Sequence, residues 1–153
     1  YAQTNVGLQY ANGLTDRVDV RFRYEMVFPD GLDSGIGDIN VFAIAPKVSL
    51  LEDQLAYNMP IGFAFGEDIE TNETVEIHPT MIFTQDLSDQ VELNLSGKYI
   101  IPLDSDRDNL VAFNVSFGGL LNSAIIRPSA GILLNPGEEG IFFDVGLGLS
   151  VPL

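Results

Sequence analysis

The chain has 153 residues, of which 46% are hydrophobic, and 22 acidic residues against seven basic ones give a net charge of −15. This length suggests a single domain, and the hydrophobic share excludes a disordered acidic tail. The shortage of lysine and arginine argues against nucleic acid as a partner, because phosphate contacts need these side chains.

Nine segments alternate apolar and polar residues with a period of two, which predicts β-strands. Their approximate ranges are 2–11, 16–28, 38–50, 54–66, 74–85, 90–102, 110–119, 123–134 and 141–153. Asn12-Gly13 is expected to turn the first strand into the second. No segment shows a helical period, and no apolar run reaches the ~18 residues of a membrane-spanning helix.

The segment 16–28 shows the alternation most clearly. Its even positions from Val18 to Phe28 are apolar, whereas Asp19, Arg21 and Arg23 fall on the opposite face. It is longer than the usual strand of about five or six residues. It could cross a bilayer, which takes a tilted strand of about 9–11 residues.

Residue size indicates which face is inside. The apolar face carries nearly all the bulky residues, and the polar face is rich in glycine, alanine, serine and asparagine. Because the inside of a small barrel is narrow, we expect the bulky face to point outward, to lipid. The aromatic residues expected to face lipid are Phe22, Tyr24, Phe42, Tyr57, Phe63, Phe65, Phe83, Tyr99, Phe113, Phe117 and Phe143.

The polar face is expected to form a charge-balanced network in the lumen. Its members are Asp19, Arg21, Arg23, Glu25, Lys47, Glu76, His78, Glu92, Lys98, Arg127 and Asp144. Apart from His78 this set holds five charges of each sign, as a confined interior requires, because unpaired buried charge is expensive.

Hairpin pairing suggests particular neighbours within this network. If Phe83 pairs with Val91, Glu76 lies opposite Lys98 and His78 opposite Ser96. If Tyr10 pairs with Val18, Gly7 faces Arg21 and Asn5 faces Arg23.

Four prolines interrupt the predicted strands, at positions 46, 60, 79 and 128. Proline removes a donor from the ladder, so we expect local bulges there.

The other 17 acidic residues lie in connections, twelve of them in 29–38, 67–73, 104–109 and 135–140. These longer connections are expected to form the exterior rim. The sequence thus predicts an all-β, antiparallel up-and-down transmembrane barrel. Nine strands can be read, but bacterial barrels have even counts, so ten or more are expected, with an N-terminal strand preceding Tyr1. A secretory signal, if there was one, is expected to have been removed.

Short motifs resemble known sequences. The stretch Tyr10 to Val20 and the stretch Gly35 to Val41 are similar to recurring pieces of bacterial outer-membrane barrels, above all the phenol-degradation-pathway outer-membrane-like family. Asp144-x-Gly146-x-x-Leu149-x-Val151 is similar to the signal read by the barrel-assembly machinery, although Pro152-Leu153 departs from its terminal aromatic residue. The resemblance implies passage of small hydrophobic compounds.

Two clusters have alternative interpretations. His78 could serve as a catalytic base that Glu76 orients. No turn motif marks a nucleophile, however, so no catalytic residue is predicted. Asp104 to Asn109 begins like a calcium loop, yet Asn109 and Val115 stand where such a loop needs glycine and glutamate. Neither a metal site nor a cofactor is predicted, and a solvated acidic rim is the simpler interpretation.

Three functions stay open. The first is a bacterial outer-membrane protein that acts as a narrow porin-like channel or transporter for a small-molecule solute, with membrane lipid or lipopolysaccharide as partner. The second is a plugged barrel that serves as a structural or interaction protein, or as a subunit of a larger envelope assembly. The third is a soluble ligand-binding barrel.

Overall fold

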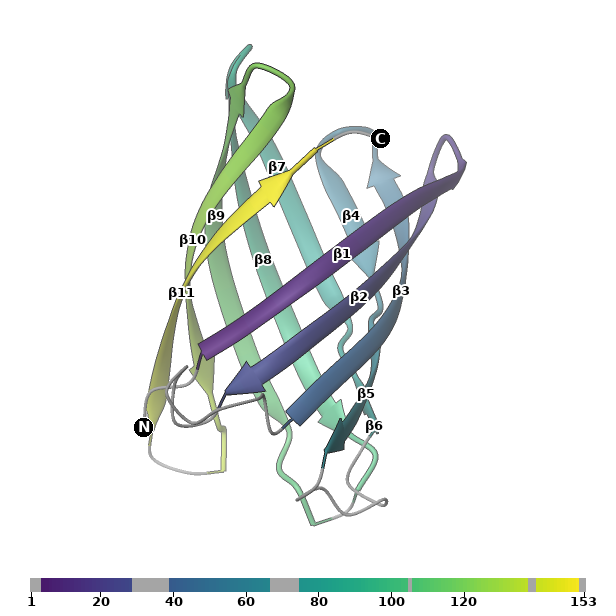
Figure 1. The fold of residues 1–153 in the computed structure, drawn as a ribbon, viewed down its shortest axis with the longest axis vertical. Helices are drawn as coiled ribbons and strands as arrows, with labels where there is room; N and C mark the ends of the chain where they lie inside the picture. The colour runs from purple at the N-terminus through teal and green to yellow at the C-terminus, as the bar shows by residue number, and fades with distance from the viewer. Residues whose placement is uncertain (1–3, 29–38, 67–74, 105, 138–139, 152–153) are drawn as a thin grey trace.

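The computed structural model describes residues 4–28, 39–66, 75–104, 106–137 and 140–151, which form one antiparallel sheet (Figure 1). The strands are β1 (Thr4–Thr15), β2 (Val18–Phe28), β3 (Ile39–Leu51), β4 (Leu55–Asn58), β5 (Ile61–Gly66), β6 (Val75–Ile77), β7 (Thr80–Ser88), β8 (Val91–Pro102), β9 (Leu110–Leu121), β10 (Ala124–Leu134) and β11 (Ile141–Ser150). No helix that could cross a membrane occurs in these described parts of the chain.

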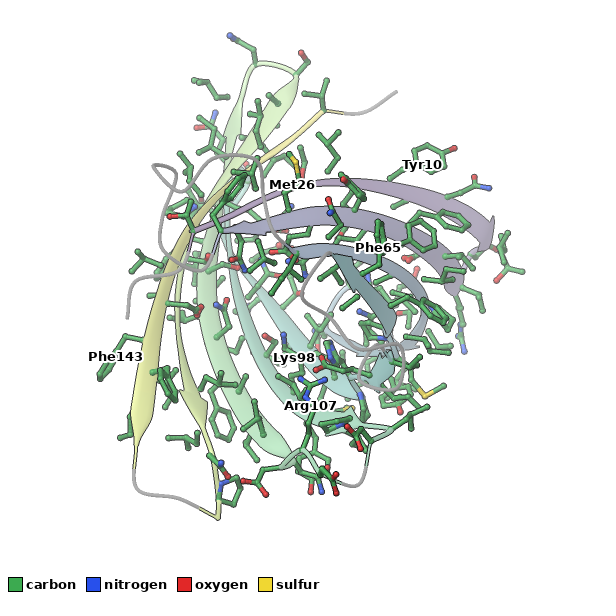
Figure 2. All side chains as sticks on the ribbon, turned by 60° about the horizontal axis from the view of Figure 1, so that its bottom comes forward. Tyr10, Met26, Phe65, Lys98, Arg107 and Phe143 are labelled. Atoms are coloured by element: carbon green, nitrogen blue, oxygen red, sulfur yellow. The ribbon has the colours of Figure 1, made fainter. Side chains whose placement is uncertain are left out.

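The predicted all-β antiparallel fold is confirmed. Neighbours in the sheet follow the order β1-β2-β3-β4-β7-β8-β9-β10-β11, while β5 pairs with β3 and β6, and β6 also pairs with β8. The pair β4 and β5 corresponds to one predicted segment, and so does the pair β6 and β7. The sheet curls strongly about its long axis, which gives it a concave inner face and a convex outer face (Figure 1, Figure 2).

The prolines interrupt the ladder without shifting its register. Lys47 pairs with Asn58 and Ile44 with Ile61, so β4 and β5 hold the same register against β3 on both sides of Met59-Pro60. The prediction of bulges at the four prolines is therefore wrong. At Pro128, β9 and β10 leave two residue pairs unbonded, but the register is the same before and after them. A proline lacks the N–H group for one ladder bond, yet no extra residue is inserted in either strand.

Proline carbonyl groups keep the interrupted strands joined. Met59 donates its backbone N–H to Pro46 at 3.0 Å, His78 to Pro60 at 2.8 Å and Tyr99 to Pro79 at 3.0 Å. These three bonds thus join four neighbouring strand positions, from β3 to β8. Register shifts occur instead beside three turns, between Gly13 and Thr15, Ser49 and Leu51, and Asp86 and Ser88.

Two predicted turns are misplaced, which changes the predicted pairs. The first turn is Asp16-Arg17 rather than Asn12-Gly13, and Tyr10 pairs with Phe22, so Gly7 faces Glu25. Asn5 faces Val27, not Arg23.

In the hairpin of β7 and β8, β7 continues to Ser88, and Phe83 pairs with Leu95 rather than Val91. Lys98 consequently lies opposite Thr80, while Glu76 lies opposite Pro102. Each strand runs further into a tighter turn than the sequence suggested. In both hairpins the observed register differs from the predicted one by an even number of residues, so each side chain stays on its predicted face of the sheet.

Apart from Val27 and Phe28 at one end of β2, the most buried side chains are small or polar. Ala43, Ala45 and Ala56 are 7–8% exposed, and Glu25 and Thr80 are each 8% exposed. Among the described residues no large side chain is fully buried. The sheet therefore has no conventional apolar core, and its tightest packing is on the concave face.

The turn between β9 and β10 should be sensitive to side-chain shape at one position. Asn122 has a φ of 55°, a left-handed conformation that β-branched residues avoid. We predict that Asn122→Val lowers the free energy of unfolding by about 1–2 kcal/mol, whereas Asn122→Gly changes it little. Urea titration measures both, with Ser123→Val in the same turn as control; equal losses at both positions would contradict the assignment.

Candidate functional site: the charged inner face

The charged residues of the predicted network lie on the concave face of the sheet. Figure 2 shows Lys98 and Arg107 within the curl, whereas Tyr10 and Phe143 point away from it. Of the eleven aromatic residues predicted to point outward, ten are exposed and Tyr57 is half-buried. The structure thus separates the two faces as the alternation predicts (Figure 2).

Ion pairs join most of these charges. Arg21 donates from Nε to Asp19 Oδ1 at 3.1 Å, and Lys47 Nζ lies 3.6 Å from Asp19 Oδ2. Arg23 and Glu25 approach to 2.5 Å. On β2 and β3, three cations thus meet two carboxylates.

Glu76 has different partners from those predicted. His78 Nε2 lies 2.8 Å from one of its carboxylate oxygens, and Arg107 donates to the other. Arg107 comes from the connection after β8, so register reasoning on strands alone could not find it. Thr80, the nearest hydroxyl along the strand, donates to the His78 carbonyl at 2.7 Å rather than to its ring. The Glu76 carboxylate is thus shared between a histidine and an arginine.

A second cluster reaches across a whole strand. Arg127 on β10 donates to Glu92 on β8, passing over β9. Asn94 donates to Glu92 at 3.1 Å, and Thr84 donates to Asn94 at 2.8 Å. Neighbouring strands lie about 4.8 Å apart, so strands β8 and β10 are near 10 Å apart and only long side chains can bridge them.

Glycine makes this bridge possible. Gly118 on β9 pairs directly with Glu92, and a Cβ there would lie 2.6 Å from both Cγ and Oε1 of Glu92. The same arrangement recurs one strand further along. Asn114 on β9 donates to Asp144 on β11 at 3.5 Å across Gly131, where a Cβ would lie 2.3 Å from Asp144 Oδ1.

The pattern extends to every acidic residue of the predicted network. Each one has a glycine as a cross-strand partner; the pairs are Asp19 with Gly13, Glu25 with Gly7, Glu76 with Gly62, Glu92 with Gly118 and Asp144 with Gly131. The sequence shows that the polar face is rich in glycine, but which glycine lies opposite which carboxylate is known only from the observed register. The carboxylate itself lies over its glycine at Glu92 and Asp144, whereas a Cβ at Gly13 would not meet Asp19.

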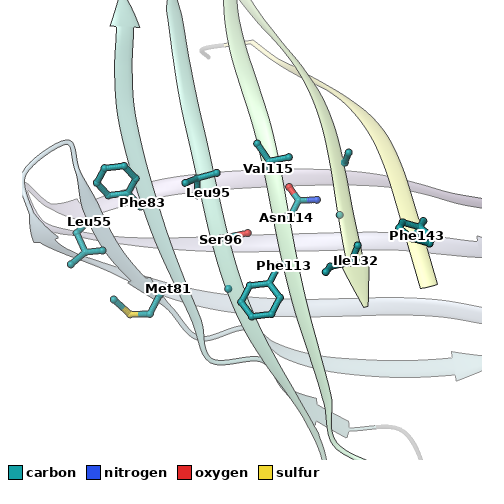
Figure 3. Close-up of a pocket in the computed structure, with 13 residues that line it drawn as sticks. Leu55, Met81, Phe83, Leu95, Ser96, Phe113, Asn114, Val115, Ile132 and Phe143 are labelled. Atoms are coloured by element: carbon teal, nitrogen blue, oxygen red, sulfur yellow. The ribbon is translucent and has the colours of Figure 1, made fainter. Parts of the chain in front are cut away.

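The outer face carries a shallow apolar hollow (Figure 3). Its volume is about 660 Å³, and Met81, Phe83, Leu95, Phe113 and Phe143 are among the residues that line it. It lies over Gly97, whose missing side chain leaves the Phe113 ring about 3.5 Å from where a Cβ would stand. Its walls suit an acyl chain or another apolar surface rather than a polar substrate.

The acidic connections show no ion site in the described residues. Asp104 accepts a bond from the Asp106 N–H at 3.1 Å, and Asp108 accepts one from Asn135 at 3.0 Å. No cluster of three histidine or acidic side chains in the described parts has an arrangement suited to a metal. The connections 29–38 and 67–73 and most of the Gly35–Val41 motif lie outside the described residues, as does Pro152-Leu153.

No family model, curated protein or solved structure matches this chain.

Substituting the glycines beneath the bridging side chains should disrupt the network. We predict that Gly118→Ala and Gly131→Ala each lower the free energy of unfolding by about 1–2 kcal/mol, because the new methyl group displaces Glu92 or Asp144. Urea titration measures the loss.

The matched control is Gly13→Ala, also within a strand, where a Cβ would meet nothing within 4 Å. It should be neutral or stabilising by about 0.5 kcal/mol, as expected for removing glycine from a strand. Equal behaviour of all three variants would show that the carboxylates do not depend on these glycines.

Proposed function

We propose that this chain forms a transmembrane β-barrel of a bacterial outer membrane, with a narrow porin-like or transport role for small molecules. The observation that carries the proposal is the inverted arrangement of its two faces. Large apolar side chains are exposed on the convex side, while charged and small residues fill the concave side.

The exposure of individual side chains supports lipid contact. On β11, Phe143 is 80% exposed, Val145 88% and Leu147 77%. In water, a continuous apolar surface of this kind would drive association, because monomeric soluble proteins rarely expose large apolar patches. A soluble ligand-binding barrel would place these residues inside, so this arrangement argues against it.

Strand length and connections fit a bilayer. The uninterrupted strands β1, β2, β3, β8, β9, β10 and β11 have 10–13 residues, and about 9–11 suffice for a tilted crossing. Two-residue turns at 16–17, 89–90 and 122–123 alternate with the longer acidic connections. In outer-membrane barrels short turns face the periplasm, so the acidic connections belong outside. There they could interact with lipopolysaccharide through divalent cations, and the outer hollow could accept an acyl chain.

A charged substitution separates lipid from water as the surrounding medium. Val145 lies in the middle of β11, and Ile141 lies at its start on the same face. We predict that Val145→Lys destabilises the vesicle-inserted protein by about 2–4 kcal/mol and Ile141→Lys by about 0–1 kcal/mol, because the cost of a charge rises toward the bilayer centre.

Urea unfolding in phospholipid vesicles provides the measurement. A soluble protein would tolerate lysine at both exposed positions within about 0.5 kcal/mol. A chain that is monomeric and stable in buffer without detergent, with both variants neutral, would refute the membrane proposal.

A second candidate, a plugged barrel with a structural or interaction role, is favoured by one observation. The Glu92–Arg127 pair crosses the concave face, and together with the Arg107–Glu76 pair it occupies space that a solute would need. Interiors of about eight strands are commonly filled by side chains, whereas open channels need about sixteen.

Conductance decides between the two candidates. If the chain transports solutes, planar bilayers should show reproducible small current steps. We expect Glu92→Gln/Arg127→Gln to change their size or ion selectivity, because the pair lines the path. Asp53→Asn, in a turn away from the concave face, is the control. Silence of the wild-type protein and of both variants, despite verified insertion, would favour the plugged barrel.

A further inference from the structure

The sheet has two edges that do not pair with each other. In the described part of the chain, β1 pairs only with β2 and β11 only with β10, so each has one free row of backbone donors and acceptors. Residues 5–15 of β1 and all of β11 are exposed. In water such rows are solvated, but in hydrocarbon every unpaired N–H and C=O group costs several kcal/mol.

The two free edges run in the same direction. From β1 to β11 the sheet contains nine strand positions, with β4 and β5 sharing one and β6 and β7 another, and every step between neighbours is antiparallel. Eight reversals bring the last strand back to the direction of the first. Figure 1 shows β1 and β11 rising together and separating toward their ends.

Direction determines what can cover these edges. A second copy inserted with the same orientation also presents only edges that run the same way, so it could pair only in parallel, and no parallel pair occurs among the described strands. A single strand running the opposite way would be antiparallel to β1 and to β11 at once. It would also restore the even strand count of bacterial barrels.

The charge of Asp144, on the free edge strand β11, indicates which residue type the added strand should carry beside it. Asp144 on β11 lies on the concave face, and its only hydrogen bond in the described structure is the 3.5 Å contact from Asn114. It is the one acidic member of the network without a cation within 4.0 Å among the described residues. Lys98, which has no ion pair among the described residues, interacts with Asp144 only beyond 4.0 Å. A lysine or arginine on the neighbouring strand would supply the close pairing seen at Asp19, Glu25, Glu76 and Glu92.

We propose that the β1 and β11 edges together bind one antiparallel strand from a polypeptide segment outside residues 1–153. This strand carries apolar residues on its outer face, small residues on its inner face, and an inward cation beside Asp144. The proposal rests on the proposed function, because only a lipid surround makes both free edges untenable.

A synthetic strand tests the proposal on the intact chain in detergent micelles. The probe is a peptide of about eleven residues, the length of a membrane-crossing strand, with valine and leucine alternating with glycine and serine and one central inward lysine. The control peptide has the same composition with the alternation broken. Amide hydrogen exchange, resolved by residue, reports on both edges, and β9 is the internal reference because both of its sides are paired.

The expected result is slow exchange on β9, fast exchange on the free rows of β1 and β11, and at least about tenfold slowing on both edges with the patterned peptide only. Protection of one edge alone, or equal effects of the two peptides, would overturn the proposal. So would slow exchange on both edges without peptide, which would show that β1 and β11 pair directly. Vesicle insertion of the same chain is measured separately, so failure of the membrane proposal is distinguishable.

The inward cation has its own test. Replacing the peptide lysine by serine should weaken binding to the wild-type chain about threefold but leave binding to Asp144→Asn unchanged. Asp86→Asn, at the end of β7 and away from both edges, should retain the wild-type preference for lysine. The role of Asp144 would be refuted if Asp144→Asn kept the preference for the lysine peptide, or if Asp86→Asn lost it as well.

Discussion

The charged side chains of the concave face meet one another along and across the strands, and small residues beside them make these contacts possible. Side chains on the inside of a strongly curled sheet converge, so a charged residue packs most easily where at least one cross-strand partner is small. Glycine lies opposite all five network carboxylates, and alanine lies opposite Arg21, Arg23 and Lys98. Small partners allow the charged groups to lie along the wall and meet one another.

The same constraint explains why the bulky residues are outside. Phenylalanine and leucine need the greater circumference of the convex face, where Phe113 covers the bare backbone at Gly97. Exposed apolar surface of this kind is what the proposed lipid surround would cover. The size of the residues and their polarity thus lead to the same orientation, although they are independent properties of the sequence.

How much the sequence could predict depended on whether a feature is local. Alternation along a strand is local, so the all-β fold, the nine segments and the division of residues between faces followed from it. Register is not local. Asn12-Gly13 is a strong turn signal, yet the chain continues as strand through it because pairing with Val20 and Asp19 extends β1 to Thr15. The predicted partners of Glu76 and Lys98 failed for the same reason.

Two features of the site required three-dimensional information. Arg107 reaches Glu76 from a connection, and Arg127 reaches Glu92 across an entire strand, so neither pair is a neighbour in any hairpin. The pairing of each carboxylate with a glycine can be read from the sequence only once the register of each strand pair is known. With that register known, each network carboxylate has a glycine on one side, whereas the partner on its other side can be larger, as Val41 is beside Glu25 and Pro102 beside Glu76. Only at Gly118 and Gly131 would a Cβ lie within 3 Å of the carboxylate side chain opposite, so these are the two positions where lateral bridging depends on glycine.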